Sequence, residues 1–253
     1  MIANYHTHTW RCNHAEGTEE EYCLAAMERG LQMLGFSDHT PYIFPGDYYS
    51  TFRMRMEQYD DYVQTVLKLR EKFRGKLQIP LGLEAEYYPK YFPELLAKLR
   101  DSPLDYLILG QHFVGNEELY SGAATEDAEV LSRYCRQVMD AMNTGLFSYV
   151  AHPDILRYVG EPRIYRQHML ELCREAKNVG IPLEINLLGL RQNRWYPGES
   201  FWALAAEAGC EVVYGIDAHA PWHLLERPSE ERADAIAKKY GLSVRTEVDL
   251  RPI

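Results

Sequence analysis

The sequence predicts an α/β protein in which seven strand–helix units form a parallel barrel. Short apolar runs alternate with stretches of helical periodicity along the 253 residues. Two helical stretches end at Gly180 and Gly209, and each leads directly into the next apolar run, as expected between a helix and a parallel strand. An open doubly wound sheet is the alternative, but it would hold the first and last strands apart.

The apolar runs give the expected strands in order. They cover residues 1–5, 34–37, 77–83, 104–110, 147–151, 181–185 and 212–216, and a short alternation follows at 242–245. Thr18 and Glu21 have the spacing of a capping box, which predicts a first helix that ends at Gly30. Apolar spacing predicts further helices over 57–73, 92–100, 126–142, 164–178, 200–208 and 230–240.

The composition bounds the class of protein. A 46% hydrophobic and 25% charged chain is typical of a soluble globular protein, and without a linker or low-complexity segment one domain over 1–253 is favoured over two small ones. A net charge of −10 argues against nucleic acid or an anionic membrane as a partner. A small anionic substrate remains compatible, because bound divalent cations reverse the local charge.

The cysteines and the chain start favour a cytoplasmic location. The five cysteines are odd in number and scattered, which fits buried thiols in a reducing compartment better than a disulfide framework. We expect neither a signal segment at the start nor a membrane span. Cys12 is the least certain of the five, since it lies between His8 and His14.

Seven of the nine histidines stand at the downstream edges of the expected strands, and Glu84 and Asp217 stand in the same kind of place. The seven are His6, His8, His14, His39, His112, His152 and His219. Because parallel strands present their carboxyl ends on one face, these side chains are expected to converge. Imidazoles with a few carboxylates suit Zn, Mn or Fe.

The local spacing supports a site for several ions. His6 and His8 share one side of a strand, as do Glu84 and Glu86. A carboxylate such as Glu84 can bridge two ions, whereas an imidazole cannot. Asp38 is expected to orient a ligand imidazole from outside the site. A single histidine in any of these places is as well explained by ordinary packing, so the prediction depends on the set.

Two histidines and two long segments remain outside this pattern. His168 is expected on a solvated helix face, and the role of His223 stays open. Segments 42–55 and 115–125 are expected to lack helices and to lie over the site. Tyr42, Tyr48 and Tyr49 gather in the first of them, either through ordinary loop packing or as the aromatic wall of a lid.

Six segments resemble the motifs of the PHP (polymerase and histidinol phosphatase) family, in order and over nearly the whole chain. They are His6–His8, Phe36–Pro41, Gly82–Glu84, Gly110–Phe113, Ala151–Asp154 and Gly215–His219. Segments 36–41, 78–87 and 152–158 look most like the histidinol-phosphatase branch. The chain departs from that branch at Gly110-Gln111-His112, where Ser-Val-His is more usual.

This resemblance implies a distorted, TIM-like (β/α)7 barrel with its active site at the carboxyl ends of the strands. It also implies three divalent metal ions, which are Zn, Mn or Fe, and no organic cofactor. The first ion would bind His6, His8, Glu84 and Asp217, the second Glu84, His112 and His152, and the third His14, His39 and His219. Glu84, Asp217 and His219 are expected to be catalytic as well.

The resemblance also implies a phosphate-binding region. Arg157, Arg191 and Arg194 are the candidates, because an arginine can hold a phosphate through two parallel donors. Solvated surface arginines are the alternative.

The expected activity is that of a phosphomonoesterase that acts on L-histidinol phosphate in histidine biosynthesis, by attack of a metal-bridging hydroxide. The alternatives are another small phosphate ester or a phosphodiester, a non-catalytic polymerase accessory module, and a metal-dependent amidohydrolase. The sequence leaves the oligomeric state open.

Overall fold

A seven-stranded parallel sheet forms the centre of the computed structural model, which describes residues 1–253. Its strands are β3 (Phe36–His39), β4 (Leu81–Ala85), β5 (Tyr106–Leu109), β8 (Phe147–Val150), β9 (Leu183–Asn186), β10 (Glu211–Gly215) and β11 (Ser243–Val244). They lie in the order β11-β10-β9-β8-β5-β4-β3, and all neighbours are parallel. The predicted α/β fold with a parallel central sheet is therefore confirmed.

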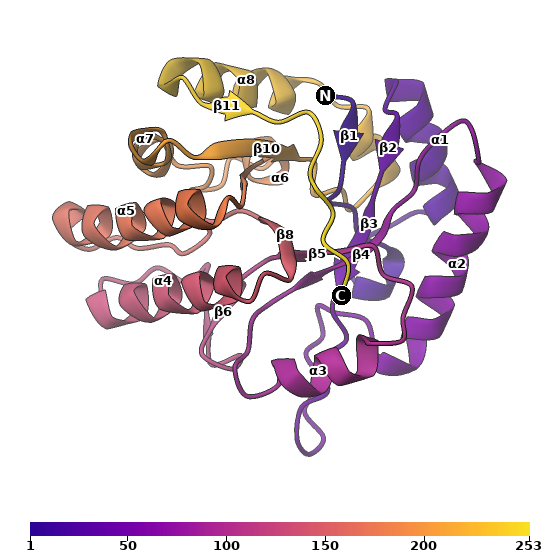
Figure 1. The fold of residues 1–253 in the computed structure, drawn as a ribbon, viewed down its shortest axis with the longest axis horizontal. Coiled ribbons are helices and arrows are strands. Elements are labelled where there is room, and N and C mark those ends of the chain that lie inside the picture. The colour runs from indigo at the N-terminus through magenta and orange to yellow at the C-terminus, as the bar shows by residue number, and fades with distance from the viewer.

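Eight α-helices surround these strands, as Figure 1 shows. They are α1 (Glu19–Arg29), α2 (Tyr59–Lys72), α3 (Phe92–Leu99), α4 (Ala128–Asn143), α5 (Pro162–Val179), α6 (Leu187–Arg191), α7 (Glu199–Ala208) and α8 (Pro228–Tyr240). Three short 3-10 helices are η1 (Trp10–Cys12), η2 (Met56–Gln58) and η3 (Pro221–Leu224). No helix combines the length and the apolar character that crossing a lipid bilayer requires.

Every helix expected from the sequence is present, with bounds within two residues of the prediction. The capping box is formed, since the Glu21 carboxylate accepts from the Thr18 backbone N–H at 2.6 Å and the Thr18 hydroxyl accepts from the Glu21 N–H at 3.3 Å. Gly180 ends α5 with a φ of +69°. That left-handed conformation suits glycine because it has no Cβ.

The first strand was expected in the main sheet but lies outside it. β1 (Ala3–Asn4) pairs with β2 (Met33–Leu34), outside the seven-stranded sheet, whose edges are β3 and β11. The next residues bridge β3 and the segment that follows β10: the Ser37 N–H donates to the Thr7 carbonyl at 2.9 Å, and the His8 N–H donates to the Ala218 carbonyl at 2.9 Å. Backbone hydrogen bonds thus link the two sides of the sheet through residues 4–8, although no continuous ladder runs there.

A short hairpin and the helix α6 were not predicted, nor were the three 3-10 helices. The strands β6 (Phe113–Val114) and β7 (Leu119–Tyr120) form an antiparallel hairpin, and its turn and second strand lie in the segment 115–125, which was expected only to lack helices. The helix α6 follows β9 directly, where the Asn186 side chain accepts from the Gly189 N–H at 2.8 Å and caps it.

Alternation along the strands sends one set of side chains outward and another inward. On β5, Leu107 and Leu109 pack with the large core beneath the helices, whereas Tyr106 and Ile108 belong to a small inner cluster. On β4, Leu81, Leu83 and Ala85 pack outward, so Glu84 is left on the inner face. The same parity places Glu184 inward on β9.

Candidate metal centre

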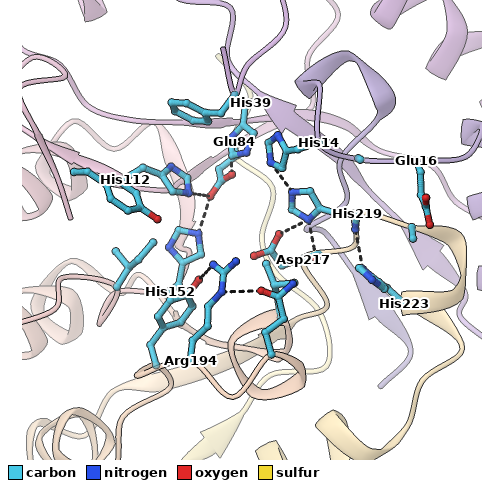
Figure 2. Close-up of a pocket in the computed structure, with 18 of the residues that line it drawn as sticks. His14, Glu16, His39, Glu84, His112, His152, Arg194, Asp217, His219 and His223 are labelled. Carbon is cyan, nitrogen blue, oxygen red and sulfur yellow. Dashed lines mark hydrogen bonds and ion pairs between the residues drawn. The ribbon is translucent and has the colours of Figure 1, made fainter. Parts of the chain in front are cut away.

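The nine predicted ligand side chains converge at the carboxyl ends of the parallel strands. His39 ends β3, Glu84 lies near the end of β4, and the others stand in the segments that follow β1, β5, β8 and β10. Figure 2 shows seven of the nine around one cavity of about 740 Å³, namely His14, His39, Glu84, His112, His152, Asp217 and His219. His6 and His8 are fully buried and do not line this cavity.

Glu84 is the hub of the cluster. Its Oε1 lies 2.9 Å from His152 Nε2, 3.5 Å from His6 Nε2 and 3.6 Å from His112 Nε2. Its Oε2 lies 3.0 Å from His39 Nδ1. The two carboxylate oxygens thus face different histidines, which is the arrangement that a bridging ligand needs.

Asp217 faces the histidines on the opposite side of the cluster. Its Oδ1 lies 3.2 Å from His8 Nε2, 3.6 Å from His6 Nε2 and 3.3 Å from His219 Nδ1. Its Oδ2 accepts a hydrogen bond from Asn186 Nδ2 at 3.0 Å. The carboxylate is therefore held by one oxygen and faces the imidazoles with the other.

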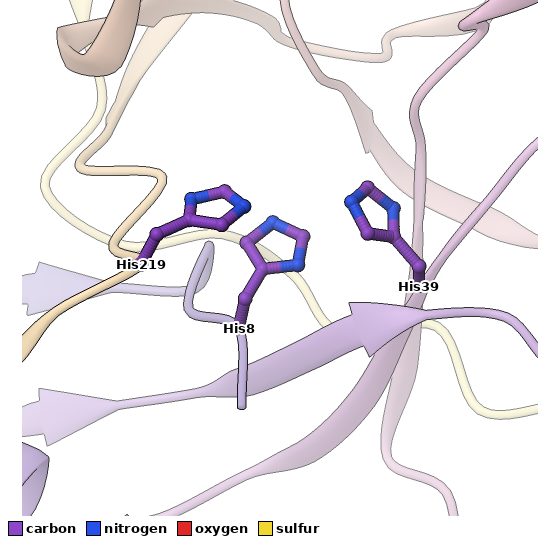
Figure 3. Close-up of side chains that lie close together, drawn as sticks. All are labelled: His8, His39 and His219. Carbon is purple, nitrogen blue, oxygen red and sulfur yellow. The ribbon is translucent and has the colours of Figure 1, made fainter. Parts of the chain in front are cut away.

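Three histidines from distant parts of the chain lie together beside these carboxylates, as Figure 3 shows. The centroid of the His8 ring lies 4.3 Å from that of His39 and 4.1 Å from that of His219, and one ligand nitrogen of each lies within 4.8 Å of the others. His14 is adjacent, with its Nε2 3.0 Å from His219 Nε2. His8 therefore stands between the residues expected to hold the first ion and those expected to hold the third.

The donor atoms fit metal ions better than they fit one another. Several of them are buried and have no hydrogen-bond partner, although an unpartnered buried polar atom is costly. They are His6 Nε2, His8 Nε2, His39 Nδ1, both Glu84 carboxylate oxygens and Asp217 Oδ1. Divalent cations would satisfy all of these atoms, and imidazole with carboxylate is the ligand set of Zn, Mn and Fe.

The electrostatics keep the carboxylates ionised. Burial alone would raise the pKa of Glu84, but the neighbouring imidazoles of His112, His6 and His39 hold that pKa well below its usual value. Burial likewise acts against the Asp217 carboxylate, and His6 and the other nearby histidines hold its pKa well below the usual range. Both groups thus carry the charge that a metal ligand needs at neutral pH.

The histidines fall into two groups. Burial lowers the pKa of His39 and of His219 well below the usual value, which leaves both rings neutral with a lone pair for a cation. Burial acts to lower the pKa of His8, but the adjacent carboxylates of Asp217 and Asp38 raise it to about 9. A cation at His8 must therefore displace a proton. Burial raises the pKa of the Cys12 thiol, which keeps this thiol protonated at neutral pH.

Carboxylates behind the cluster orient its imidazoles. Asp38, which was expected to orient a ligand imidazole, lies beside His8: its Oδ1 is 3.5 Å from Nδ1 of that ring. Sequence reasoning did not find Glu184, which accepts from His6 Nδ1 at 2.9 Å. Both Glu184 and His6 are fully buried. Such contacts fix the ring orientation and the protonated nitrogen of a metal-binding histidine.

His112 is oriented by a buried ionic network. Its Nδ1 lies 2.8 Å from Glu86 Oε1, and the other oxygen of Glu86 accepts from Arg53 at 2.8 Å. The second Nη of Arg53 donates to Glu117 at 2.8 Å, and Tyr48 donates to that same carboxylate at 3.1 Å. The fully buried Arg53 therefore ties the segment 42–55 and the β6–β7 turn to a predicted metal ligand.

The backbone at two predicted ligands is unusual. His152, just after β8, has a φ of +30°, and Asp217, just after β10, has a φ of +51°. Residues other than glycine seldom adopt this left-handed region, and strained residues of this kind concentrate at functional sites.

Gly110 lies directly against Glu84. A Cβ on this glycine would lie 1.9 Å from Glu84 Oε1 and 2.5 Å from its Cδ. Any side chain here would therefore collide with Glu84 in its present position.

Only one of the three predicted phosphate-binding arginines lines the cavity, which is Arg194. Arg157 is exposed, and its Cζ lies 5.3 Å from the centroid of the Trp195 ring. Its backbone N–H donates to the Ser121 carbonyl, and its carbonyl accepts from the Thr125 N–H, so the backbone is held in this position. Arg191 turns away from the cavity and donates to the Asp217 carbonyl at 3.4 Å and to His223 Nδ1 at 3.1 Å. Arg157 and Arg191 thus lie outside the lining of this cavity, and their predicted phosphate contact stays a prediction.

The positions of the three tyrosines in segment 42–55 agree with ordinary loop packing, which was one of the two alternatives. Tyr42, Tyr48 and Tyr49 do not line the cavity. Phe52 does, with its ring 5.0 Å from that of His39, and it stacks on Phe113 at 5.6 Å. His223, whose role the sequence left open, also lines the cavity.

Comparisons with known proteins agree with this arrangement. The model of the PHP domain matches residues 4–187. A probable histidinol-phosphatase of Deinococcus radiodurans is 33% identical over 97% of this chain and 95% of its own length. The histidinol-phosphatase of Bacillus subtilis is 26% identical over 85% of this chain and 92% of its own length. The crystal structure of histidinol phosphate phosphatase from Lactococcus lactis, complexed with Zn, L-histidinol and phosphate, has a similar fold, with a TM-score of 0.74, 22% identity and 98% of each chain covered.

Proposed function

Because this chain belongs to the PHP domain family, we propose that it is a metal-dependent phosphomonoesterase that hydrolyses L-histidinol phosphate to L-histidinol and phosphate. The observation that carries the proposal is the set of buried imidazole and carboxylate atoms without hydrogen-bond partners, next to a cavity of about 740 Å³. The names of the relatives support the choice of substrate. A cavity of this size suits a small ligand.

We propose that the nine side chains hold three divalent cations. The first set is His6, His8, Glu84 and Asp217, the second Glu84, His112 and His152, and the third His14, His39 and His219. Zinc in the Lactococcus lactis structure supports this kind of ion. Bound cations would supply Lewis-acid activation of water and of the phosphoryl group.

The chain's own residues provide charge and orientation around the reacting phosphate. Glu84, through its two oxygens, and Asp217, through Oδ1, fix the spacing of the charges; these two and His219 are the proposed catalytic residues. Arg194 is the proposed phosphate ligand, since it is the one predicted arginine in the cavity. Its Nη1 donates to the Tyr196 hydroxyl at 2.7 Å, which fixes its direction.

The proposal extends to the architecture and the setting. We propose one PHP-type domain over 1–253, closed into a barrel through residues 4–8, with a cytoplasmic location that the five unpaired cysteines favour. The small phosphate ester is the proposed partner, and the net charge of −10 argues against nucleic acid.

A panel of phosphate esters tests the function. The protein reconstituted with Zn, Mn or Fe is assayed with L-histidinol phosphate, other small phosphomonoesters and a phosphodiester. We expect the highest kcat/KM for L-histidinol phosphate. Glu84→Gln should lower kcat by several orders of magnitude together with the metal content, whereas the exposed Glu207→Gln serves as the matched control. A tenfold preference for another ester would reassign the substrate.

A further inference from the structure

The two ends of the cavity carry opposite charges. At one end stands the guanidinium of Arg194, beside Tyr196. The carboxylate of Glu16 stands at the other end. The backbone N–H of Glu16 donates to the His219 carbonyl at 2.9 Å, which holds this residue next to the metal cluster. Figure 2 shows Glu16 and His223 on the side of His219, and Arg194 on the side of His152. A phosphate is attracted to the arginine end and repelled from the glutamate end.

The tautomer of His223 is fixed by its neighbours. Its Nδ1 lies 3.0 Å from the backbone N–H of His219, which can only donate, and 3.1 Å from Nη2 of Arg191, which also can only donate. Nδ1 must therefore carry the lone pair, and the proton of the ring resides on Nε2. Arg191 thus acts on the cavity through His223 and does not enter it.

The Nε2–H of His223 is the free donor of this ring. No protein group pairs with it, and the ring, which is only 8% exposed, lines the cavity. The neighbouring Trp222 ring lies edge-on at 4.2 Å, and η3 carries both residues. A neutral imidazole held in this way presents a hydrogen-bond donor in one fixed direction.

We propose that Glu16 and His223 recognise the organic half of the phosphate ester. Glu16 takes the ammonium group of the substrate, and Nε2–H of His223 donates to a lone pair on its imidazole ring. The phosphate then lies toward Arg194 and the metal cluster. This inference rests on the proposed function and assigns the orientation of the substrate within the cavity.

Two substitutions of His223 separate this role from a structural one. In His223→Asn, the amide oxygen can replace the Nδ1 acceptor for the His219 N–H, but the Nε2 donor is lost. In His223→Gln, the longer side chain can return an N–H donor near the Nε2 position while the Nδ1 acceptor is lost. A residue needed only to hold His219 and Arg191 tolerates the asparagine better, and a substrate ligand tolerates the glutamine better.

The assay compares L-histidinol phosphate with p-nitrophenyl phosphate, which has neither an ammonium group nor an imidazole. We expect His223→Asn to lower kcat/KM about fivefold to tenfold more for L-histidinol phosphate than for p-nitrophenyl phosphate. His223→Gln should recover part of this loss. Glu16→Gln should lower kcat/KM for L-histidinol phosphate about fivefold, less so at high salt, because an exposed charge pair is screened. His168→Asn, on α5 away from the cavity, is the matched control.

Each outcome decides one question. Equal losses for both substrates, or better activity of His223→Asn than of His223→Gln, would overturn the recognition role and leave the phosphatase proposal intact. Wild-type protein that hydrolyses p-nitrophenyl phosphate but not L-histidinol phosphate would instead overturn the proposed substrate. Metal content measured on every variant distinguishes loss of recognition from loss of the metal centre.

Discussion

Replacing Glu184 by glutamine should weaken metal binding although no proposed ligand is changed. The Glu184 carboxylate accepts from His6 Nδ1 through one oxygen and from Asn186 Nδ2 at 2.7 Å through the other. Asn186 cannot turn its amide over, because its oxygen accepts from the Gly189 N–H and its nitrogen also donates to Asp217. A glutamine at 184 therefore has to point its NH2 group at His6.

His6 then has two unfavourable options. It can keep its proton on Nδ1, but this N–H and the NH2 group of the glutamine then face each other as two donors, in a site with no exposure to solvent. It can instead move the proton to Nε2, where the lone pair for the cation has to be. Substitutions of this outer layer typically cost 10- to 100-fold in metal affinity, which is about 1.4–2.7 kcal/mol.

The affinity for zinc, measured by competition with a chromophoric chelator, tests this reasoning. We expect Glu184→Gln to bind zinc about 10- to 100-fold more weakly than the wild type and to lose kcat at limiting zinc. Glu207→Gln, which removes a charge from an exposed ion pair with Arg166, should match the wild type. Zinc affinity of Glu184→Gln within twofold of the wild-type value would refute the proposed control of the His6 tautomer.

Three further predictions address the geometry, the phosphate and the protons of the site. Gly110→Ala should lower kcat by about 100-fold, because its Cβ would lie 1.9 Å from Glu84 Oε1 and displace that carboxylate. Steady-state kinetics test this, with Gly198→Ala as the control, since the atom nearest to a Cβ there is 3.2 Å away. Arg194→Ala should lower kcat/KM by roughly 10- to 100-fold with unchanged metal content by elemental analysis, as loss of a charged hydrogen bond to phosphate requires. Metal affinity should rise between pH 7 and pH 9. Without metal the pKa of His8 is raised to about 9, so the ring is protonated below that pH and must lose its proton before it binds a cation. Calorimetry in buffers of different ionisation enthalpy should show this proton release.

The fold and the convergence of the histidines and carboxylates could be predicted from the sequence because both depend on order along the chain. A glycine after a periodic stretch ends a helix, as Gly180 does, and a polar residue after an apolar run stands at the end of a strand. Parallel strands bring these ends together without further information. For this reason His8 and His219 meet even though 211 positions separate them.

The supporting residues could not be predicted, because nothing local identifies their partners. Glu184 stands inside an apolar run, and its partner His6 is 178 residues away. Arg53 lies in a segment without regular structure, yet it is fully buried between Glu86 and Glu117. The direction of Arg157 depends on hydrogen bonds between its backbone and the segment after β7, which no spacing rule reveals.

The left-handed backbone at His152 and Asp217 has a consequence for the evolution of this fold. Each such residue costs on the order of 1 kcal/mol or more, which a glycine at the same position would avoid. Selection for stability alone would therefore replace both residues, and only selection for activity keeps them. A descendant of this protein that had lost its catalytic role should lose these two side chains early and become harder to unfold as it does so.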